Sequence, residues 1–202
     1  PWAAYWELRA RLEEAQPAEV TAFLQRYAGT YQEDRLRNDW LLLLGQRRDW
    51  SQFAEQHPSY RMSDDREVRC YALLIDQIKG TAPATVAEDV RSNWYAIRDA
   101  DDGCTHAARE LYGYKKLSAL DVWRKARLGV EANRPRVVRT AVEIVSPDSL
   151  PQVKDVLDAP SKYLRSRATA AGKARLDLVL QESILDRADG VDADGILESE
   201  DE

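Results

Sequence analysis

Apolar residues along the chain recur at helical spacing. Val20, Phe23, Leu24 and Tyr27 lie three or four positions apart, and Val138, like the residues after it, repeats the pattern. Such a stripe places apolar side chains on one face of an α-helix, where neighbouring helices bury them. No segment alternates apolar and polar residues between turn signals, so no β-strands are predicted. The chain is therefore expected to be all-α.

Prolines, hydroxyl residues and glycines divide this pattern into about twelve short helices. Three prolines are expected in first turns: Pro17, Pro83 and Pro135. Three residues are expected as N-caps: Thr30, Ser63 and Ser118. Four glycines are expected where helices stop: Gly29, Gly45, Gly80 and Gly113. The expected helices span residues 2–15, 17–28, 31–46, 49–57, 64–79, 83–97, 103–113, 118–132, 135–146, 149–158, 160–171 and 173–188.

Short helices with tight connections, two per 30 to 35 residues or so, are typical of stacked helical hairpins. The predicted architecture is a right-handed superhelix, or solenoid, of antiparallel hairpins. Residues 1–188 are expected to form one continuous array, and the acidic residues 189–202 a weakly structured end. A single hairpin leaves its apolar face uncovered, so the array depends on contacts between neighbours.

The composition narrows the possible partners. The chain has 202 residues and a net charge of −6, which argues against a general nucleic-acid binder. No apolar run approaches the roughly 20 residues that span a bilayer. Arginines and a lysine form two local basic clusters, expected to be solvated helix faces, with an anion site as the alternative. These clusters are Arg134, Arg136 and Arg139, and Lys162, Arg165 and Arg167.

No catalytic constellation is apparent in the residues. Neighbouring acids such as Glu13 and Glu14, or Asp64 and Asp65, point in different directions on a helix. Two histidines have no base or nucleophile nearby in sequence, and nucleophile-elbow, phosphate-loop, dinucleotide and zinc-protease motifs are absent. We therefore expect no catalytic, cofactor-binding or metal-ligating residue. The histidines are His57 and His106.

The tryptophans and cysteines leave alternatives. Four tryptophans are expected in the core rather than on sugar-stacking surfaces: Trp40, Trp50, Trp94 and Trp123. Cys70 and Cys104, the only cysteines, are compatible with a disulfide in an oxidising compartment or with two buried thiols.

Seven short motifs follow one another in a recognisable order. They are Tyr5-Trp6-Glu7-Leu8, Asp34-Arg35-Leu36-Arg37-Asn38-Asp39-Trp40-Leu41, Leu44-Gly45, Arg48-Asp49-Trp50 with Phe53, Arg69-Cys70-Tyr71, Asp102-Gly103-Cys104, and Val122-Trp123-Arg124-Lys125-Ala126-Arg127-Leu128. Together they resemble the helical N-terminal region of soluble lytic murein transglycosylases, over residues 2–175. That family's lysozyme-like catalytic domain has no counterpart, since Glu182-Ser183 lacks the downstream segment that accompanies the family's catalytic glutamate.

The resemblance implies a periplasmic, non-catalytic helical scaffold. Its parent enzyme would cleave peptidoglycan between N-acetylmuramic acid and N-acetylglucosamine and leave a 1,6-anhydromuramoyl end. The implied partners are the lysozyme-like domain of the same parent chain and peptidoglycan glycan strands. A tetratricopeptide-like interaction module, with an open groove and reduced cysteines, is the alternative. An α/α enzyme, with a deep pocket of acids or a histidine, is a third hypothesis.

The resemblance also implies a disulfide between Cys70 and Cys104. These residues fall on alternate expected helices, which lie side by side in stacked hairpins. The Cα–Cα distance is then expected to be about 4.4–6.8 Å. In the chain-entropy model such a bond stabilises the fold by about 4 kcal/mol.

Overall fold

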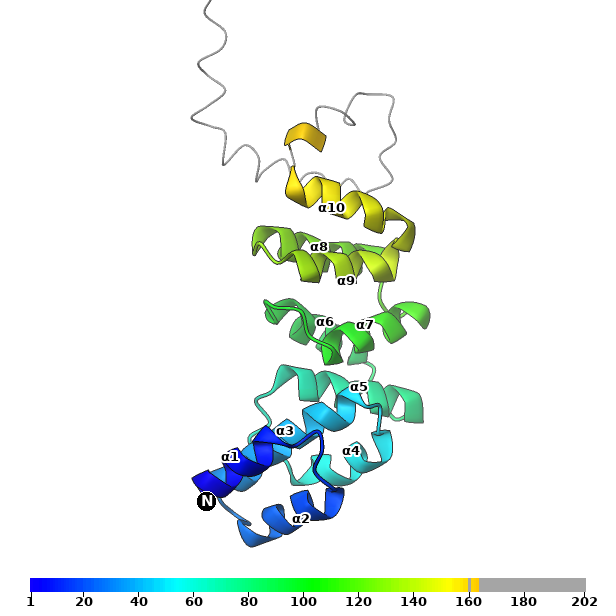
Figure 1. Cartoon of the computed structure of the whole chain (residues 1–202). Helices are drawn as coiled ribbons and strands as arrows, with labels where there is room; N and C mark the ends of the chain where they lie inside the picture. Colours follow the sequence, from blue (N-terminus) through cyan, green and yellow to red (C-terminus); the bar gives the residue numbers. More distant parts are fainter. Residues whose placement is uncertain (160, 164–202) are drawn as a thin grey trace, which may run out of the picture. The chain divides into compact units, whose positions relative to one another are not determined.

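The computed structural model describes residues 1–159 and 161–163, and all the regular structure in these ranges is helical (Figure 1). The α-helices are α1 (Trp2–Ala10), α2 (Pro17–Arg26), α3 (Tyr31–Gln46), α4 (Trp50–Gln56), α5 (Arg66–Lys79), α6 (Val86–Ala96), α7 (Gly103–Gly113), α8 (Ala119–Glu131), α9 (Pro135–Val145) and α10 (Leu150–Asp158). Two 3₁₀ helices are η1 (His57–Ser59) and η2 (Pro147–Ser149). The all-α prediction is confirmed for these residues.

Some expectations fall outside the described residues. They are the helix over 160–171 except for residues 161–163, the helix over 173–188, Arg165 and Arg167, Glu182-Ser183, and the acidic end 189–202. The stacking of the hairpins into a superhelix stays a prediction.

Several helix boundaries follow from the capping residues that the sequence indicates. The Thr30 hydroxyl accepts a hydrogen bond from the Glu33 N–H at 3.2 Å, at the start of α3. Ser118 caps α8 in the same way, and Gly80 ends α5 in the left-handed conformation. Pro17 and Pro135 occupy first turns. α3 and α7 have the expected ranges, and most of the other helix ends differ by one to a few residues.

Three boundary expectations are wrong. Asp65, not Ser63, caps α5, because its carboxylate accepts from the N–H groups of Glu67 and Val68 at 2.9 and 3.1 Å. Gly45, by contrast, is the penultimate residue of α3, which ends at Gln46 as expected, and it is buried. α1 ends at Ala10 and is followed by turns, and α6 begins three residues after Pro83, at Val86.

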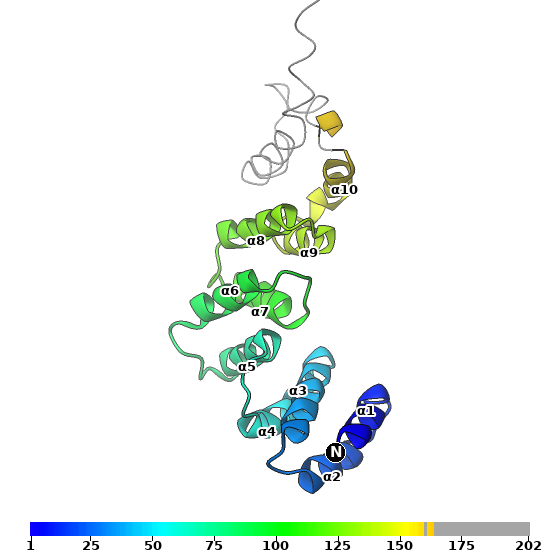
Figure 2. The same cartoon turned by 90° about the vertical axis from the view of Figure 1, so that its left-hand side faces the viewer.

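The described chain divides into two compact units. The first comprises Pro1–Trp94 and Asp101–Ala107, and the second comprises Tyr95–Ala100 and the described residues from Ala108 onward. Within the first unit, α1 lies beside α3 in both views (Figures 1 and 2). Its core consists of one cluster of apolar side chains: Tyr5, Leu8, Leu12, Val20, Phe23, Leu24, Leu36, Trp40, Leu41, Leu44, Phe53, Tyr60, Val68, Tyr71 and Ile75.

In the second unit, α8 and α9 form a closely packed hairpin. A Cβ added at Gly129 would lie 3.0 Å from the backbone nitrogen of Val138, so the two helices approach closely there. α9 is strongly amphipathic, and its buried face consists of valine and alanine side chains. The buried apolar residues of the two helices include Val122, Trp123, Ala126, Val130, Val137, Val138, Ala141 and Val142.

The core expectation for the tryptophans is confirmed for three of the four. Trp94 is fully buried, and Trp40 and Trp123 are each 5% exposed, whereas Trp50 is half-buried. In the ranges the structure describes, no helix combines the length and apolar character needed to cross a membrane.

Candidate functional site: the disulfide-centred junction

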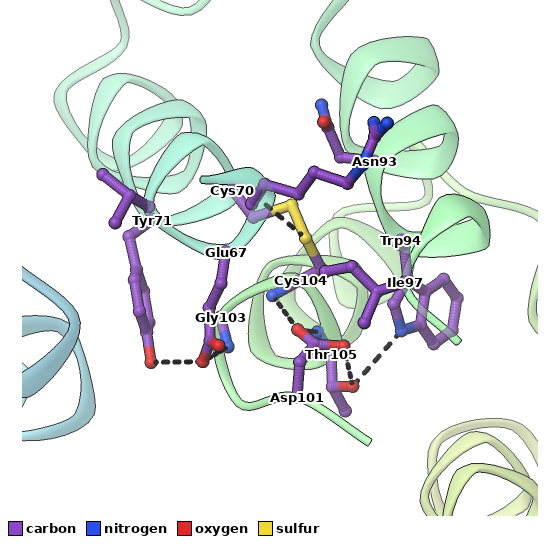
Figure 3. Close-up of a disulfide and its surroundings, with 12 residues drawn as sticks. Glu67, Cys70, Tyr71, Asn93, Trp94, Ile97, Asp101, Gly103, Cys104 and Thr105 are labelled. Carbon is purple, nitrogen blue, oxygen red and sulfur yellow. Dashed lines mark hydrogen bonds between the residues drawn. A yellow bond between two sulfur atoms is a disulfide. The ribbon is translucent and has the colours of Figure 1, made fainter. Parts of the chain in front are cut away.

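Cys70 and Cys104 join α5 to the start of α7. Their Cα atoms lie 4.9 Å apart and their sulfur atoms are bonded, so the expected distance is confirmed (Figure 3). Both cysteines are fully buried. We call the residues around this bond the junction: Gly45, Arg48, Trp50, Glu67, Cys70, Tyr71, Asp101, Asp102, Gly103, Cys104 and His106.

Two carboxylates cap the start of α7 on either side of the disulfide. Glu67, from α5, accepts hydrogen bonds from the N–H groups of Asp102 and Gly103 at 3.0 and 2.9 Å. Asp101 accepts from the Cys104 N–H at 2.6 Å. The first N–H groups of a helix have no helical partner, so these acids satisfy donors that would otherwise be lost. The disulfide therefore links two elements that are also held by capping bonds.

Burial raises the pKa of Glu67 above its usual value, by more than the hydrogen bonds from Gly103 and Asp102 lower it. The Glu67 side chain lies directly against the backbone of Gly103. A Cβ at Gly103 would overlap the Glu67 side chain and lie 2.8 Å from its carbonyl oxygen. A side chain at position 103 would thus displace the cap.

The turn between α3 and α4 enters the junction through Arg48. Its guanidinium forms an ion pair with Asp102, and a second nitrogen donates to the same carboxylate at 3.0 Å. Arg48 also donates to the carbonyl of Gly45 at 2.8 Å, and its own backbone is in the left-handed region, with φ of 59°. The pair is bidentate, the geometry in which arginine binds a carboxylate most specifically.

Tyr71 completes the link between these segments. Its hydroxyl donates to Asp102 at 2.5 Å, and its ring lies near the Arg48 guanidinium and the Trp50 ring, at 5.9 and 6.0 Å. Burial and the hydrogen bond to Asp102 raise the pKa of Tyr71, so the phenol stays protonated. Burial alone would raise the pKa of Asp102, but the bonds from Arg48 and Tyr71 outweigh it and lower that pKa.

The chemistry of the junction is that of a structural joint. The carboxylate of Asp102 is ionised and held by a cation and a phenol, and Glu67 is held by two backbone donors. Both described cavities, at the α1–α3 face and beside α8, lie away from these groups. Among residues 1–159 and 161–163, no three His, Cys, Asp or Glu side chains are placed to hold a metal ion.

The two histidines lie against aromatic rings. His106 stacks on Trp50, with ring centroids 6.3 Å apart, and His57 stacks on Phe53 at 5.5 Å. Burial lowers the pKa of His57, which favours the neutral imidazole. Asp64 accepts a hydrogen bond from the Tyr60 hydroxyl at 2.8 Å, whereas Asp65 caps α5. The two side chains therefore point in different directions, as expected.

The basic clusters have separate surroundings. Arg136 and Arg139 are exposed on α9, as expected for a solvated face. Arg134 bonds Asp99 at 2.5 Å within the second unit. That unit also buries Lys125, whose ammonium donates to the carbonyl of Ile97 at 2.7 Å beside a cavity of about 300 Å³.

A second polar cluster on α3 was not anticipated. Asp34 is 2% exposed and accepts from the N–H groups of Arg61 and Met62 at 2.9 and 2.6 Å. Glu33 and Arg37 form a buried ion pair at 2.6 Å one turn away. The signal was present in the sequence, because Asp34, like Arg37, falls on the stripe that includes Leu41.

Comparison with protein-family models and with curated proteins finds no match.

Proposed function

We propose that this chain is the non-catalytic helical scaffold of a periplasmic peptidoglycan lytic transglycosylase. In this proposal it positions a separate lysozyme-like domain of the same parent protein. That domain cleaves the bond between N-acetylmuramic acid and N-acetylglucosamine and yields 1,6-anhydromuramoyl products. The chain itself contributes no catalytic group.

The observation that carries the proposal is the convergence of the motifs on one junction. Arg48, Tyr71 and Asp102 come from three separate motifs of the resemblance and are bonded to one another. Arg48 and Asp102 are 54 positions apart in the chain. Residues that keep a family's sequence pattern for structural reasons are expected to meet in this way.

The junction suits a scaffold because its contacts join separate helices and turns into one fixed arrangement. A disulfide, a bidentate ion pair and two capping bonds hold α5, α7 and the α3–α4 turn against each other. A domain that holds another in place needs a fixed internal geometry. The disulfide also supports an oxidising compartment, such as the periplasm, over the reduced cysteines of the tetratricopeptide-like alternative.

The first test is a digestion of purified peptidoglycan by the chain alone. We expect no release of 1,6-anhydromuropeptides, measured by liquid chromatography and mass spectrometry. A lysozyme-like lytic transglycosylase domain serves as the positive control. Robust release of 1,6-anhydromuropeptides by the chain alone would refute the proposal that it is non-catalytic.

The second test is association with a catalytic domain. The isolated lysozyme-like domain of a soluble lytic transglycosylase is titrated into the chain in a calorimeter. We expect saturable binding, and no binding of an unrelated lysozyme that hydrolyses the same bond. Absence of binding to both proteins, in the oxidised chain, would contradict a positioning role.

A further inference from the structure

Exposed aromatic rings gather on the face formed by α1 and α3, away from the junction. Trp2, Trp6 and Tyr31 are 46%, 55% and 54% exposed. The Trp2 ring stacks on Trp6, with centroids 6.2 Å apart, and meets the Tyr31 ring at 5.8 Å. A large contiguous apolar patch on a protein surface is typical of a binding site.

Charged groups follow directly along the same face. Tyr5 and Arg9, from α1, both donate to the Asp39 carboxylate on α3, at 2.7 and 3.1 Å. The Arg9 guanidinium also lies 5.6 Å from the centroid of the Trp6 ring. Trp2 lies near Tyr31 and Arg9 near Asp39, so the two helices run in the same direction. The polar groups therefore come one to two turns after the rings on both helices.

A groove of about 360 Å³ continues this line between the two helices. Arg9 and Asp39 belong to both the aromatic region and the groove. We call the whole surface the α1–α3 strip. Its α3 side alone, from residue 31 to residue 46, is about 22 Å long at the rise of an α-helix. The groove is lined by Arg9, Leu12, Glu13, Asp39, Leu42, Leu43 and Gln46.

The polarity of the strip selects among possible occupants. An amphipathic partner helix needs an apolar groove with spaced pockets, but four of the seven groove residues are polar or charged. A polyanion such as a nucleic acid is disfavoured by Asp39, Glu13 and the net charge of −6. The strip offers flat rings and paired hydrogen-bonding groups in one line.

A pyranose sugar has the complementary chemistry. One face of its ring carries C–H groups that pack on an aromatic ring, and its edge carries hydroxyl and acetamido groups that bond to arginine, carboxylate and amide side chains. We propose that the α1–α3 strip binds an extended oligosaccharide of N-acetylated amino sugars. Trp2, Trp6 and Tyr31 stack on sugar rings, and the groove holds the continuing strand. The choice of amino sugars rests on the proposed function.

The binding test uses chitohexaose, a soluble strand of N-acetylglucosamine, and insoluble purified peptidoglycan. Calorimetry and indole N–H shifts in NMR spectra measure the first, and co-sedimentation measures the second. Trp2→Ala and Trp6→Ala remove stacking surface from rings that are half in water, so the fold is expected to persist. Tyr114→Ala is the matched control, because that ring is 52% exposed on the other unit.

We expect the wild-type chain to bind both probes, and each tryptophan variant to bind chitohexaose about tenfold more weakly, which corresponds to about 1.4 kcal/mol. Trp6→Phe keeps a flat ring and is expected to recover most of the affinity. Tyr114→Ala is expected to bind as the wild type does. Circular dichroism of each variant verifies that the helices remain.

Three results would overturn the inference. They are no binding of either probe by the wild type, undiminished binding by the double variant Trp2→Ala/Trp6→Ala, and self-association of the wild type that this variant abolishes without any sugar binding. The last would assign the strip to a second copy of the chain. Loss of sugar binding with retained association to the lysozyme-like domain would refute this inference and leave the proposed function standing. The reverse pattern would refute the proposed function alone.

Discussion

The ring of Tyr71 on α5 packs directly against the backbone of Gly45 on α3. A Cβ built at position 45 would overlap three atoms of that ring. The Tyr71 hydroxyl meanwhile reaches Asp102, just before α7. One side chain thus holds α5 close to α3 and to the start of α7, and it requires glycine at position 45.

Gly45→Ala is expected to lower the free energy of unfolding by about 1–3 kcal/mol, the usual cost of overpacking a filled interior. Alanine is the better helix former by about 1 kcal/mol, so a loss would show that packing decides. Urea denaturation followed by circular dichroism measures the change. Gly113→Ala is the control, because nothing lies within 4 Å of a Cβ there. Equal stability of the two variants would contradict the packing argument.

Gly45 also shows where reasoning from the sequence ends. A glycine followed by polar residues is a normal helix stop, and Gly80 behaves in that way. The requirement at Gly45 arises from Tyr71, which is 26 positions later in the chain. Local pattern predicted the helices well because apolar spacing and caps act within a few residues. It had no information on which helices approach closely.

Reduction of the Cys70–Cys104 disulfide is expected to lower the free energy of unfolding by about 4 kcal/mol in the chain-entropy model. The bond closes a loop across a separation of 34 residues, and opening it returns that freedom to the unfolded chain. Parallel urea titrations with and without a phosphine reductant measure the loss. The double variant Cys70→Ala/Cys104→Ala serves as the control and should not respond to the reductant. A wild type that is indifferent to reduction would refute the stabilising role.

Glu67→Gln is expected to change the pH dependence of stability. Burial raises the pKa of Glu67 above its usual 4.5 in the folded state, so the folded chain holds this proton more tightly than the unfolded chain. The wild type should then lose stability as pH rises from 4.5 to the raised value. Glutamine remains an acceptor for the N–H groups of Asp102 and Gly103 and does not ionise.

The stability of Glu67→Gln relative to the wild type should therefore increase as the pH rises above 4.5 and level off above the raised pKa of Glu67. Urea titrations at several pH values measure this difference, and the opposite contribution of Asp102 is common to both proteins. Glu88→Gln, on the exposed face of α6, is the matched control and should run parallel to the wild type. A difference that shrinks with rising pH would mean that the carboxylate is stabilised in the folded state.

The buried polar groups of α3 show a second limit of the sequence. Asp34 and Asn38 lie on the same stripe as Leu41, which marks them as facing the interior. The pattern alone could not name their partners. Those partners are the backbone N–H groups of Arg61 and Met62 and the carboxylate of Asp65, all more than 25 positions away. The junction carboxylates were missed for the same reason.

Asp34→Ala is expected to lower the free energy of unfolding by about 3 kcal/mol, because it leaves two N–H groups without their acceptor at a buried position. The same groups provide a local measurement: the Arg61 and Met62 amides should exchange with deuterium faster in the variant. Asp34→Asn keeps one acceptor oxygen and should fall between the alanine variant and the wild type. Glu55→Ala removes an exposed carboxylate from α4 and should leave both stability and exchange unchanged. Unaltered protection of both amides in Asp34→Ala would mean that other groups, rather than this carboxylate, hold the segment against α3.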